Sequence, residues 1–231
     1  MGERDFMTAM GESVKQELED FGTRVHFPVD HVLFVERQPV HSVLIIERGH
    51  VAVSHTAEDG TEVVLAFRGP GEPLGLDAVV TEGLQYVKAR TVSDVEVLDV
   101  PADRFMDLLE KHGKLASLLQ FFVDRLRESS EERSRQGRLT VRARFAYLLA
   151  QLAGDAGVAT DEGVVIDMSL SQADLATRIG SSRESVVKLL KVWRDLGAIE
   201  TGRRKLVIYD LPYLKRMASG GTDLWGRGYE H

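Results

Sequence analysis

The sequence predicts an α+β fold in which an N-terminal β-roll is followed by a long central helix and a C-terminal winged helix-turn-helix. Three observations predict it: apolar residues alternate with period two over the first hundred residues, a heptad pattern follows, and two short helices with a tight turn come near the end. These changes of pattern divide the chain into residues 1–112, 113–137, 138–219 and 220–231.

Composition indicates a globular protein. The 231 residues are 43% hydrophobic and include no cysteine, so disulfides, thiolate metal sites and cysteine-ligated iron–sulfur clusters are excluded. No N-terminal stretch has the pattern of a signal peptide, and no apolar run is long enough to span a bilayer. We therefore expect a cytoplasmic protein that makes no membrane contact.

The β-roll prediction depends on two stretches that come after a short helix expected near residues 7–21. "HVAVSHTAEDGTEVVLAF" alternates in the manner of an antiparallel hairpin, with its turn at Asp59-Gly60. "ARTVSDVEVLDV" repeats the period-two pattern, although both of its faces are partly apolar. These strands predict a small roll or barrel that ends near Val100.

The period becomes helical after Pro101. "ADRFMDLLEKH" predicts one short helix, and a longer helix is expected over residues 114–136. Spacings of four and three alternate along this longer helix, as in a two-stranded coiled coil, at Leu115, Leu119, Phe122, Leu126, Ser129 and Arg133. The stripe would pack either against its own domain or against a second copy; we favour a homodimer, with Leu115, Leu119, Phe122 and Leu126 in the interface.

Beyond the central helix, the pattern predicts one more helix and a loop before the basic C-terminal segment. "TVRARFAYLLAQLA" is the helix, and the glycines and acidic residues of "GDAGVATDEG" predict the loop. The last stretch, "SGGTDLWGRGYEH", is rich in glycine, and we expect it to be a flexible tail.

The segment "LSQADLATRIGSSRESVVKLLKVWRDLGAI" has the pattern of a helix-turn-helix. Ser171 followed by Asp174 is a helix-start signal, and Gly180 suits the turn because it lacks a Cβ. The apolar positions of the second helix follow i, i+3, i+4, i+7 spacing and should face the first helix; they are Val186, Leu189, Leu190 and Trp193.

That packing turns Arg183, Glu184, Lys188 and Lys191 outward. Arginine and lysine donate to guanine, and a carboxylate accepts from cytosine N4, so this face can read G·C base pairs in a major groove, while Val187 can touch a thymine methyl. Two other interpretations remain open. Glu184 would complete a capping box with Ser181, and the lysines would be an ordinary solvated face.

Local charge supports the nucleic-acid interpretation. The whole chain carries a net charge of −7, yet Ser169 to Ala218 contains ten lysines and arginines against five acidic residues. In "IETGRRKLVIYD" the residues Gly202, Arg203, Arg204 and Lys205 occupy the tip of a predicted hairpin. A basic wing of this kind would neutralise phosphates beside the second helix.

A β-roll, a central helix and the stretch "SSRESVVKLLK" together resemble the Crp/Fnr family of bacterial transcription regulators, with weaker matches in "LIIERGHVAV" and "GPGEPLGL". The resemblance implies an effector-like domain, a dimerisation helix and a DNA-binding domain in the first three segments. It implies a homodimer on a palindromic site in double-stranded DNA, with RNA polymerase as a further partner of an activator. The DNA-binding residues would be Gln172, Ser182, Arg183, Glu184, Ser185, Lys188, Arg203, Arg204 and Lys205.

In this resemblance Arg183 and Lys188 would contact guanines, Glu184 cytosine and Ser182 a phosphate. The effector site departs from the family's cyclic-AMP pattern. Leu76 follows Gly75 where the family has glutamate, and the shortened "VTEGLQY" has no arginine for the cyclic phosphate.

Two residues of the central helix, Ser129 and Ser130, still match effector positions of the family, and Arg125 lies one turn earlier. These residues do not rebuild the pocket, so we expect no cyclic AMP and leave open another nucleotide, another small molecule or no effector. Asp30 and Arg37 stand where the family often has turn glycines.

Three other functions are less consistent with the sequence. Five histidines in the roll raise the possibility of a metal or haem, but none of them has the close helical spacing of a metal pair. A cupin-type metalloenzyme would need a His-x-His strand, which does not occur. A ligand-binding module whose last domain contacts proteins would not require basic residues on both the second helix and the wing. We expect no catalytic residue, no metal and no enzymatic activity.

Overall fold

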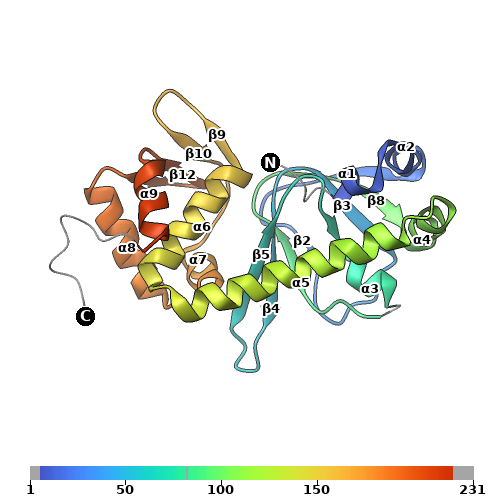
Figure 1. The fold of residues 1–231 in the computed structure, drawn as a ribbon, viewed down its shortest axis with the longest axis horizontal. Coiled ribbons are helices and arrows are strands. Elements are labelled where there is room, and N and C mark those ends of the chain that lie inside the picture. Colours follow the sequence, from blue (N-terminus) through green and yellow to red (C-terminus); the bar gives the residue numbers. More distant parts are fainter. Residues whose placement is uncertain (1–5, 82, 221–231) are drawn as a thin grey trace. The chain divides into compact units, whose positions relative to one another are not determined.

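A computed structural model describes residues 6–81 and 83–220 of the chain. The chain divides into two compact units, residues 1–129 and 130–231, which we describe separately. Helix α5, Leu115–Arg138, crosses the division as one continuous helix (Figure 1). Within the described ranges, no helix has both the length and the apolar character needed to cross a membrane.

In the described residues of the first unit, the strands form two four-stranded antiparallel sheets. The first has the order β1-β8-β3-β6 and the second has the order β2-β7-β4-β5. In the first sheet the strands are β1 Thr23–Phe27, β8 Val95–Pro101, β3 Ser42–Arg48 and β6 Pro73–Leu74. In the second they are β2 Val32–Phe34, β7 Lys88–Thr91, β4 Val51–Thr56 and β5 Glu62–Arg68. The β4–β5 pair confirms the hairpin predicted around Asp59-Gly60.

Two hydrophobic clusters hold this unit together. One lies where the two sheets face each other and includes Ile46, Val51 and Val97. The other joins the first sheet to the start of α5 and to four helices, which are α1 Phe6–Met10, α2 Glu12–Phe21, α3 Leu76–Val80 and α4 Ala102–Lys111. The first turns of α5 therefore belong to the core of the first unit through Leu118.

Within residues 130–220, the second unit has four helices in addition to the end of α5, and one antiparallel sheet of order β11-β12-β10-β9. Figure 1 labels most of these elements. The helices are α6 Val141–Asp155, α7 Gln172–Arg178, α8 Arg183–Asp195 and α9 Leu211–Ala218. The strands are β9 Gly157–Ala159, β10 Val164–Ile166, β11 Ile199–Gly202 and β12 Lys205–Ile208. At its centre Trp193 is fully buried and stacks on Phe145, with ring centroids 5.2 Å apart.

Two local predictions were wrong. The helix expected over residues 7–21 is two helices, because Gly11 between them adopts φ 86°, which no right-handed helix contains. The stretch "GDAGVATDEG" is not only a loop, since β9 pairs with β10 through Val158 and Val165. The predicted tail lies outside the described residues apart from Ser219 and Gly220.

Candidate functional site

Helices α7 and α8 form the helix-turn-helix that the sequence predicts. Ser171 caps α7, because its Oγ accepts from the Asp174 N–H at 2.9 Å and the Asp174 carboxylate accepts from the Ser171 N–H at 3.0 Å. Gly180 adopts φ 61° in the turn. Val186, Leu190 and Trp193 are buried, so the opposite face of α8 is fixed toward solvent.

That outward face carries the residues predicted to read DNA. Arg183, Glu184 and Lys188 are all exposed, and Lys191 lies one turn further along. The Arg183 Nε donates to Oε1 of Gln172, 3.3 Å away, which joins the first residues of the two helices. The first turns of this face therefore present Arg183 and Lys188 as separate cations with the Glu184 carboxylate between them, and Lys191 adds a third cation further along.

The alternative of a capping box between Ser181 and Glu184 is not realised. The N-cap of α8 is Ser182, whose Oγ accepts from the Ser185 N–H at 3.2 Å. The Glu184 carboxylate accepts hydrogen bonds from its own backbone N–H and from the Ser182 hydroxyl, and the first of these lowers its pKa most. The positive charges of Arg183 and Lys188 lower the pKa further. Glu184 is therefore an exposed, ionised acceptor.

The wing follows α8 directly. Strands β11 and β12 are joined through Arg203 and Arg204, and Arg204 adopts φ 58° in this tight connection. The tip residues from Gly202 to Lys205 are exposed. Arg194 of α8 donates to Thr201 Oγ1 of β11 at 3.0 Å, which fastens the base of the wing to the second helix of the motif.

The apolar stripe on α5 serves two purposes in the structure. Leu115, Leu119 and Leu126 remain 45%, 65% and 64% exposed. Phe122, in contrast, is half-buried and packs against the core of its own unit beside Phe121. The stripe therefore contributes one aromatic side chain to its own domain and leaves its leucines on the surface.

The effector-like segment begins at Gly75, which adopts φ 79° at the start of α3. Leu76 is buried. The guanidinium of Arg125 lies 2.5 Å from the carboxylate of Glu72, three residues before Gly75, and 4.8 Å from the centre of the Phe121 ring. Arg125 is therefore brought to the predicted segment, but a carboxylate that sequence reasoning missed already balances its charge.

The two serines of the predicted effector set lie further along α5 and are exposed. Ser130 Oγ accepts from Arg133 of the next turn at 3.3 Å. The two turn positions Asp30 and Arg37 adopt φ 64° and 63°, the conformation for which the family often uses glycine. Their backbone N–H groups bind the carbonyls of Thr91 and Gln85 at 3.0 and 2.7 Å.

Gln85 is a second residue that sequence reasoning missed. Its side chain is only 1% exposed, and neither its amide nitrogen nor its amide oxygen has a hydrogen-bond partner within the described part of the chain. It lies against Gly75, where a Cβ would come within 3.0 Å of the amide nitrogen. Burial of an unsatisfied amide costs free energy, and one polar residue in an apolar stretch gives no warning of it.

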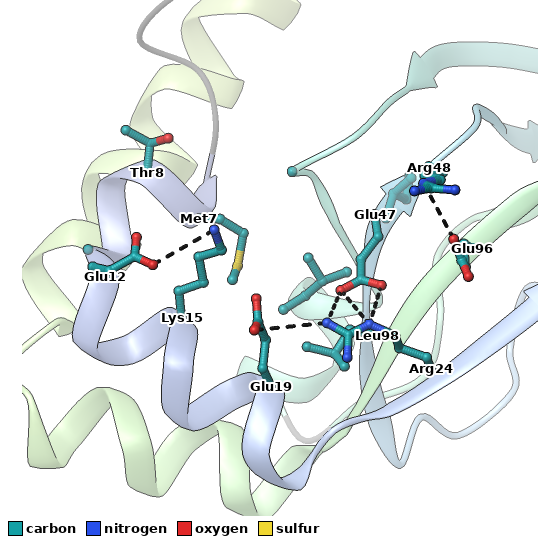
Figure 2. A pocket seen from close by; sticks show the side chains of 14 residues that line it. Met7, Thr8, Glu12, Lys15, Glu19, Arg24, Glu47, Arg48, Glu96 and Leu98 are labelled. Atoms are coloured by element: carbon teal, nitrogen blue, oxygen red, sulfur yellow. Dashed lines mark hydrogen bonds and ion pairs between the residues drawn. The ribbon is translucent and has the colours of Figure 1, made fainter.

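A separate hollow of 660 Å³ lies between helices α1 and α2 and strands β1, β3 and β8 (Figure 2). Its charged side chains largely pair with one another. Figure 2 shows Arg24 between Glu19 and Glu47, and the Arg24–Glu47 contact is a bidentate pair of 2.9 and 3.0 Å. Arg48 lies 3.6 Å from Glu96 at the rim. The charges are matched inside the hollow, and no sequence pattern pointed to it.

Two histidines of the first unit each lie beside a glutamate. His55 Nδ1 lies 3.4 Å from Glu36, and His112 Nε2 lies 2.7 Å from Glu17. Within residues 6–81 and 83–220, no three histidine, aspartate or glutamate side chains gather as a metal site would require.

Two family models match the chain. One describes a cyclic nucleotide-binding domain and matches residues 24–112; the other describes a Crp-like helix-turn-helix domain and matches residues 143–217. The chain is 28% identical over 195 residues to a CRP-like cAMP-activated global transcriptional regulator of Mycobacterium tuberculosis, covering 84% of this chain and 87% of the relative. It is 26% identical over 187 residues to a global nitrogen regulator of Synechocystis, covering 80% and 83%.

Solved structures agree in fold. A CRP/FNR family transcriptional regulator from Thermus thermophilus superposes with a TM-score of 0.70 at 23% identity, over 89% of this chain and 100% of the other. A c-di-GMP responsive global regulator from Xanthomonas campestris superposes with the same TM-score at 21% identity, over 85% and 98%. These relatives share the order of β-rich domain, long helix and helix-turn-helix.

Proposed function

Because the chain belongs to the Crp/Fnr family of transcription regulators, we propose that it is a sequence-specific DNA-binding regulator that reads a palindromic operator as a homodimer. The observation that carries the proposal is the exposed face at the start of α8, where Arg183, Glu184 and Lys188 project from a helix whose other side is buried. A DNA-reading role also favours the cytoplasm, and it needs no catalytic group.

The exposed face at the start of α8 would contact the bases. Arg183 and Lys188 are donors for guanine O6 and N7, and the ionised Glu184 is an acceptor for cytosine N4. A carboxylate directed at DNA repels phosphates, so Glu184 would weaken general attraction to DNA. Its position between Arg183 and Lys188 is instead consistent with the reading of bases. The half-sites of the operator would therefore contain G·C pairs.

Phosphate contacts fall to the edges of the same surface. Ser182 and Ser185 stand at the exposed N-terminus of α8, where backbone N–H groups favour an anion. On the other side, Arg203, Arg204 and Lys205 project from the wing, which Arg194 holds to α8. Gln172 completes the set through its bond to Arg183.

Dimerisation would use the exposed leucines of α5. Leu115, Leu119 and Leu126 form a surface stripe at heptad spacing. A two-fold dimer places two recognition helices about one turn of DNA apart, so a palindromic operator is the geometric consequence. If the protein activates transcription, RNA polymerase is a further partner.

The effector, where one is used, would differ from cyclic AMP. Arg125 is held by Glu72, and Leu76 is buried where a ribose-binding glutamate would stand. The unpartnered Gln85 amide offers an NH₂ donor group and a carbonyl acceptor to a neutral group instead. A small molecule without an exposed phosphate fits these groups better than an anionic cyclic nucleotide.

Selection from a randomised DNA pool, with and without cyclic AMP at physiological salt, tests the proposal. We expect a palindrome with G·C-containing half-sites to be enriched in both conditions. Enrichment only with cyclic AMP would overturn the effector proposal, and no enrichment in either condition would count against DNA reading. Arg48→Ala, which removes a cation far along the chain from the motif, is the control and should select the same palindrome as the wild type.

A further inference from the structure

One guanidinium in the second unit binds the ends of two helices. Arg144 of α6 donates from Nη1 to the carbonyls of Gln136 and Leu139, each 2.9 Å away. From Nε it donates to the carbonyl of Ile179 at 2.8 Å, and from Nη2 to that of Gly180 at 3.2 Å. Its fork therefore holds backbone from the end of α5 and from the turn between α7 and α8.

These four carbonyls are the kind that need an outside partner. The last carbonyls of a helix have no N–H of their own helix to accept from, and the negative end of the helix dipole favours a cation there. Gln136 and Leu139 lie at the C-terminal end of α5, while Ile179 is the C-cap of α7. Only a planar side chain with several fixed donors reaches both ends at once.

A second contact joins the same two segments independently. Arg178, the last residue of α7, lies 2.9 Å from the carboxylate of Glu132 on α5, and its side chain is only 12% exposed. Gln136 also approaches the turn, since a Cβ on Gly180 would come within 3.7 Å of its side chain. The end of α5 and the turn of the motif are thus held at two places.

We propose that Arg144 is a positioning residue for DNA reading: it fixes the turn that precedes α8 to the end of the central helix, so that the two segments move as one body. This inference rests on the proposed function. α8 begins three residues after Gly180, so the direction of its N-terminus depends on where that turn is held. Arg144 acts on Arg183 and Lys188 through backbone and is assigned no contact with DNA.

The proposal is tested by measuring affinity for the selected operator and for random DNA. Three proteins are compared: the wild type, Arg144→Gln and Arg138→Gln. Arg138 is an exposed cation in the last turn of α5 and serves as the matched loss of charge. We expect Arg144→Gln to weaken binding to the selected operator about tenfold, the equivalent of one charged hydrogen bond, with affinity for random DNA unchanged. Arg138→Gln should leave the ratio of the two affinities unchanged. Equal losses on both DNAs would overturn the proposal.

Amide hydrogen exchange without DNA separates positioning from general stability. The Leu139 N–H binds the Arg135 carbonyl and the Ser181 N–H binds the Ala176 carbonyl, each at 2.9 Å, at the two capped ends. In Arg144→Gln both amides should exchange faster while amides of β10 and β12 keep their wild-type rates. Faster exchange throughout the unit would assign Arg144 a structural role only.

If Arg144→Gln does not fold, Arg144→Lys provides a second test of the proposal. It keeps the charge, but a single ammonium group cannot bridge both pairs of carbonyls. We expect a folded protein with operator affinity between those of wild type and Arg144→Gln; wild-type affinity and exchange would overturn the proposal. If the wild type itself selects no operator, the proposed function fails, while the exchange comparison still tests whether the two segments are joined.

Discussion

Nε of Arg183 and Oε1 of Gln172 are 3.3 Å apart, so the first residue of α8 is hydrogen-bonded to the first residue of α7. This bond restrains a long side chain before DNA arrives. Restraint in advance lowers the entropy that binding must remove. It also gives Gln172 a part in recognition through Arg183.

Arg183→Ala should therefore lower operator affinity by about 1–3 kcal/mol and relax the preference at one base pair of each half-site. Gln172→Ala should cost less, about 0.5–1.5 kcal/mol, because it removes one neutral acceptor and leaves the reading group in place. Competition binding against operators altered at single positions measures both. Equal losses on operator and random DNA for Arg183→Ala would contradict base reading.

Substitutions in the wing should affect binding in a different way, through its strength on all sequences and its dependence on salt. Arg204 adopts φ 58°, so asparagine, which tolerates this conformation, is a better replacement than alanine. Arg204→Asn should weaken binding to all sequences alike and make the salt slope less steep by about one unit. Titrations at several salt concentrations give the slope. A change of sequence preference would instead assign Arg204 to base contacts.

If the exposed leucines of α5 form the dimer interface, a charged side chain introduced among them should dissociate the dimer. Leu119→Glu should shift the protein to monomer and abolish tight operator binding, because a buried carboxylate in the seam would lack a partner. Gln120→Glu, on the neighbouring exposed position, is the control and should leave the dimer intact. Sedimentation velocity distinguishes the species, and an unchanged dimer in Leu119→Glu would refute the seam.

Two glycines predict opposite changes in stability. Gly180 has φ 61°, and its nearest neighbours leave ordinary room for a Cβ, so Gly180→Ala should destabilise by about 1–2 kcal/mol through backbone strain alone. Gly154 lies in α6 with open space around it, so Gly154→Ala should stabilise by about 0.5–1 kcal/mol. Denaturant unfolding of both variants checks the sign of each effect.

Glu17 predicts a dependence of stability on acid. Hydrogen bonds from Lys111, first, and His112 lower its pKa from the ordinary value. A lowered pKa means that the folded state favours the ionised form, so its stabilising contribution is complete above the ordinary pKa and is lost as the pH falls through the folded one. Glu17→Gln should therefore make the stability less sensitive to acid. The measurement is the midpoint of denaturant unfolding at a series of pH values, which should fall less steeply in the variant than in the wild type as the pH is lowered.

Local patterns were sufficient for much of the fold. The β4–β5 hairpin, helix α5 and the outward face of α8 all follow from side-chain periods, which a few neighbouring residues determine. An alternative that the sequence left open, a capping box at Ser181, was also decided locally. Ser181 and Ser182 both satisfy the spacing of an N-cap, and only the backbone conformation of the turn selects Ser182.

The sequence by itself determined the order of the parts, the basic character of the last domain and the residues available to read G·C pairs. Only the tertiary structure decided that Arg125 is neutralised by Glu72, 53 residues away, and that Gln85 is buried without a partner. It also decided that Arg144 joins the carbonyls of Gln136 and Gly180. Such contacts depend on how distant segments pack, and periodicity along the chain reports only which face each segment buries.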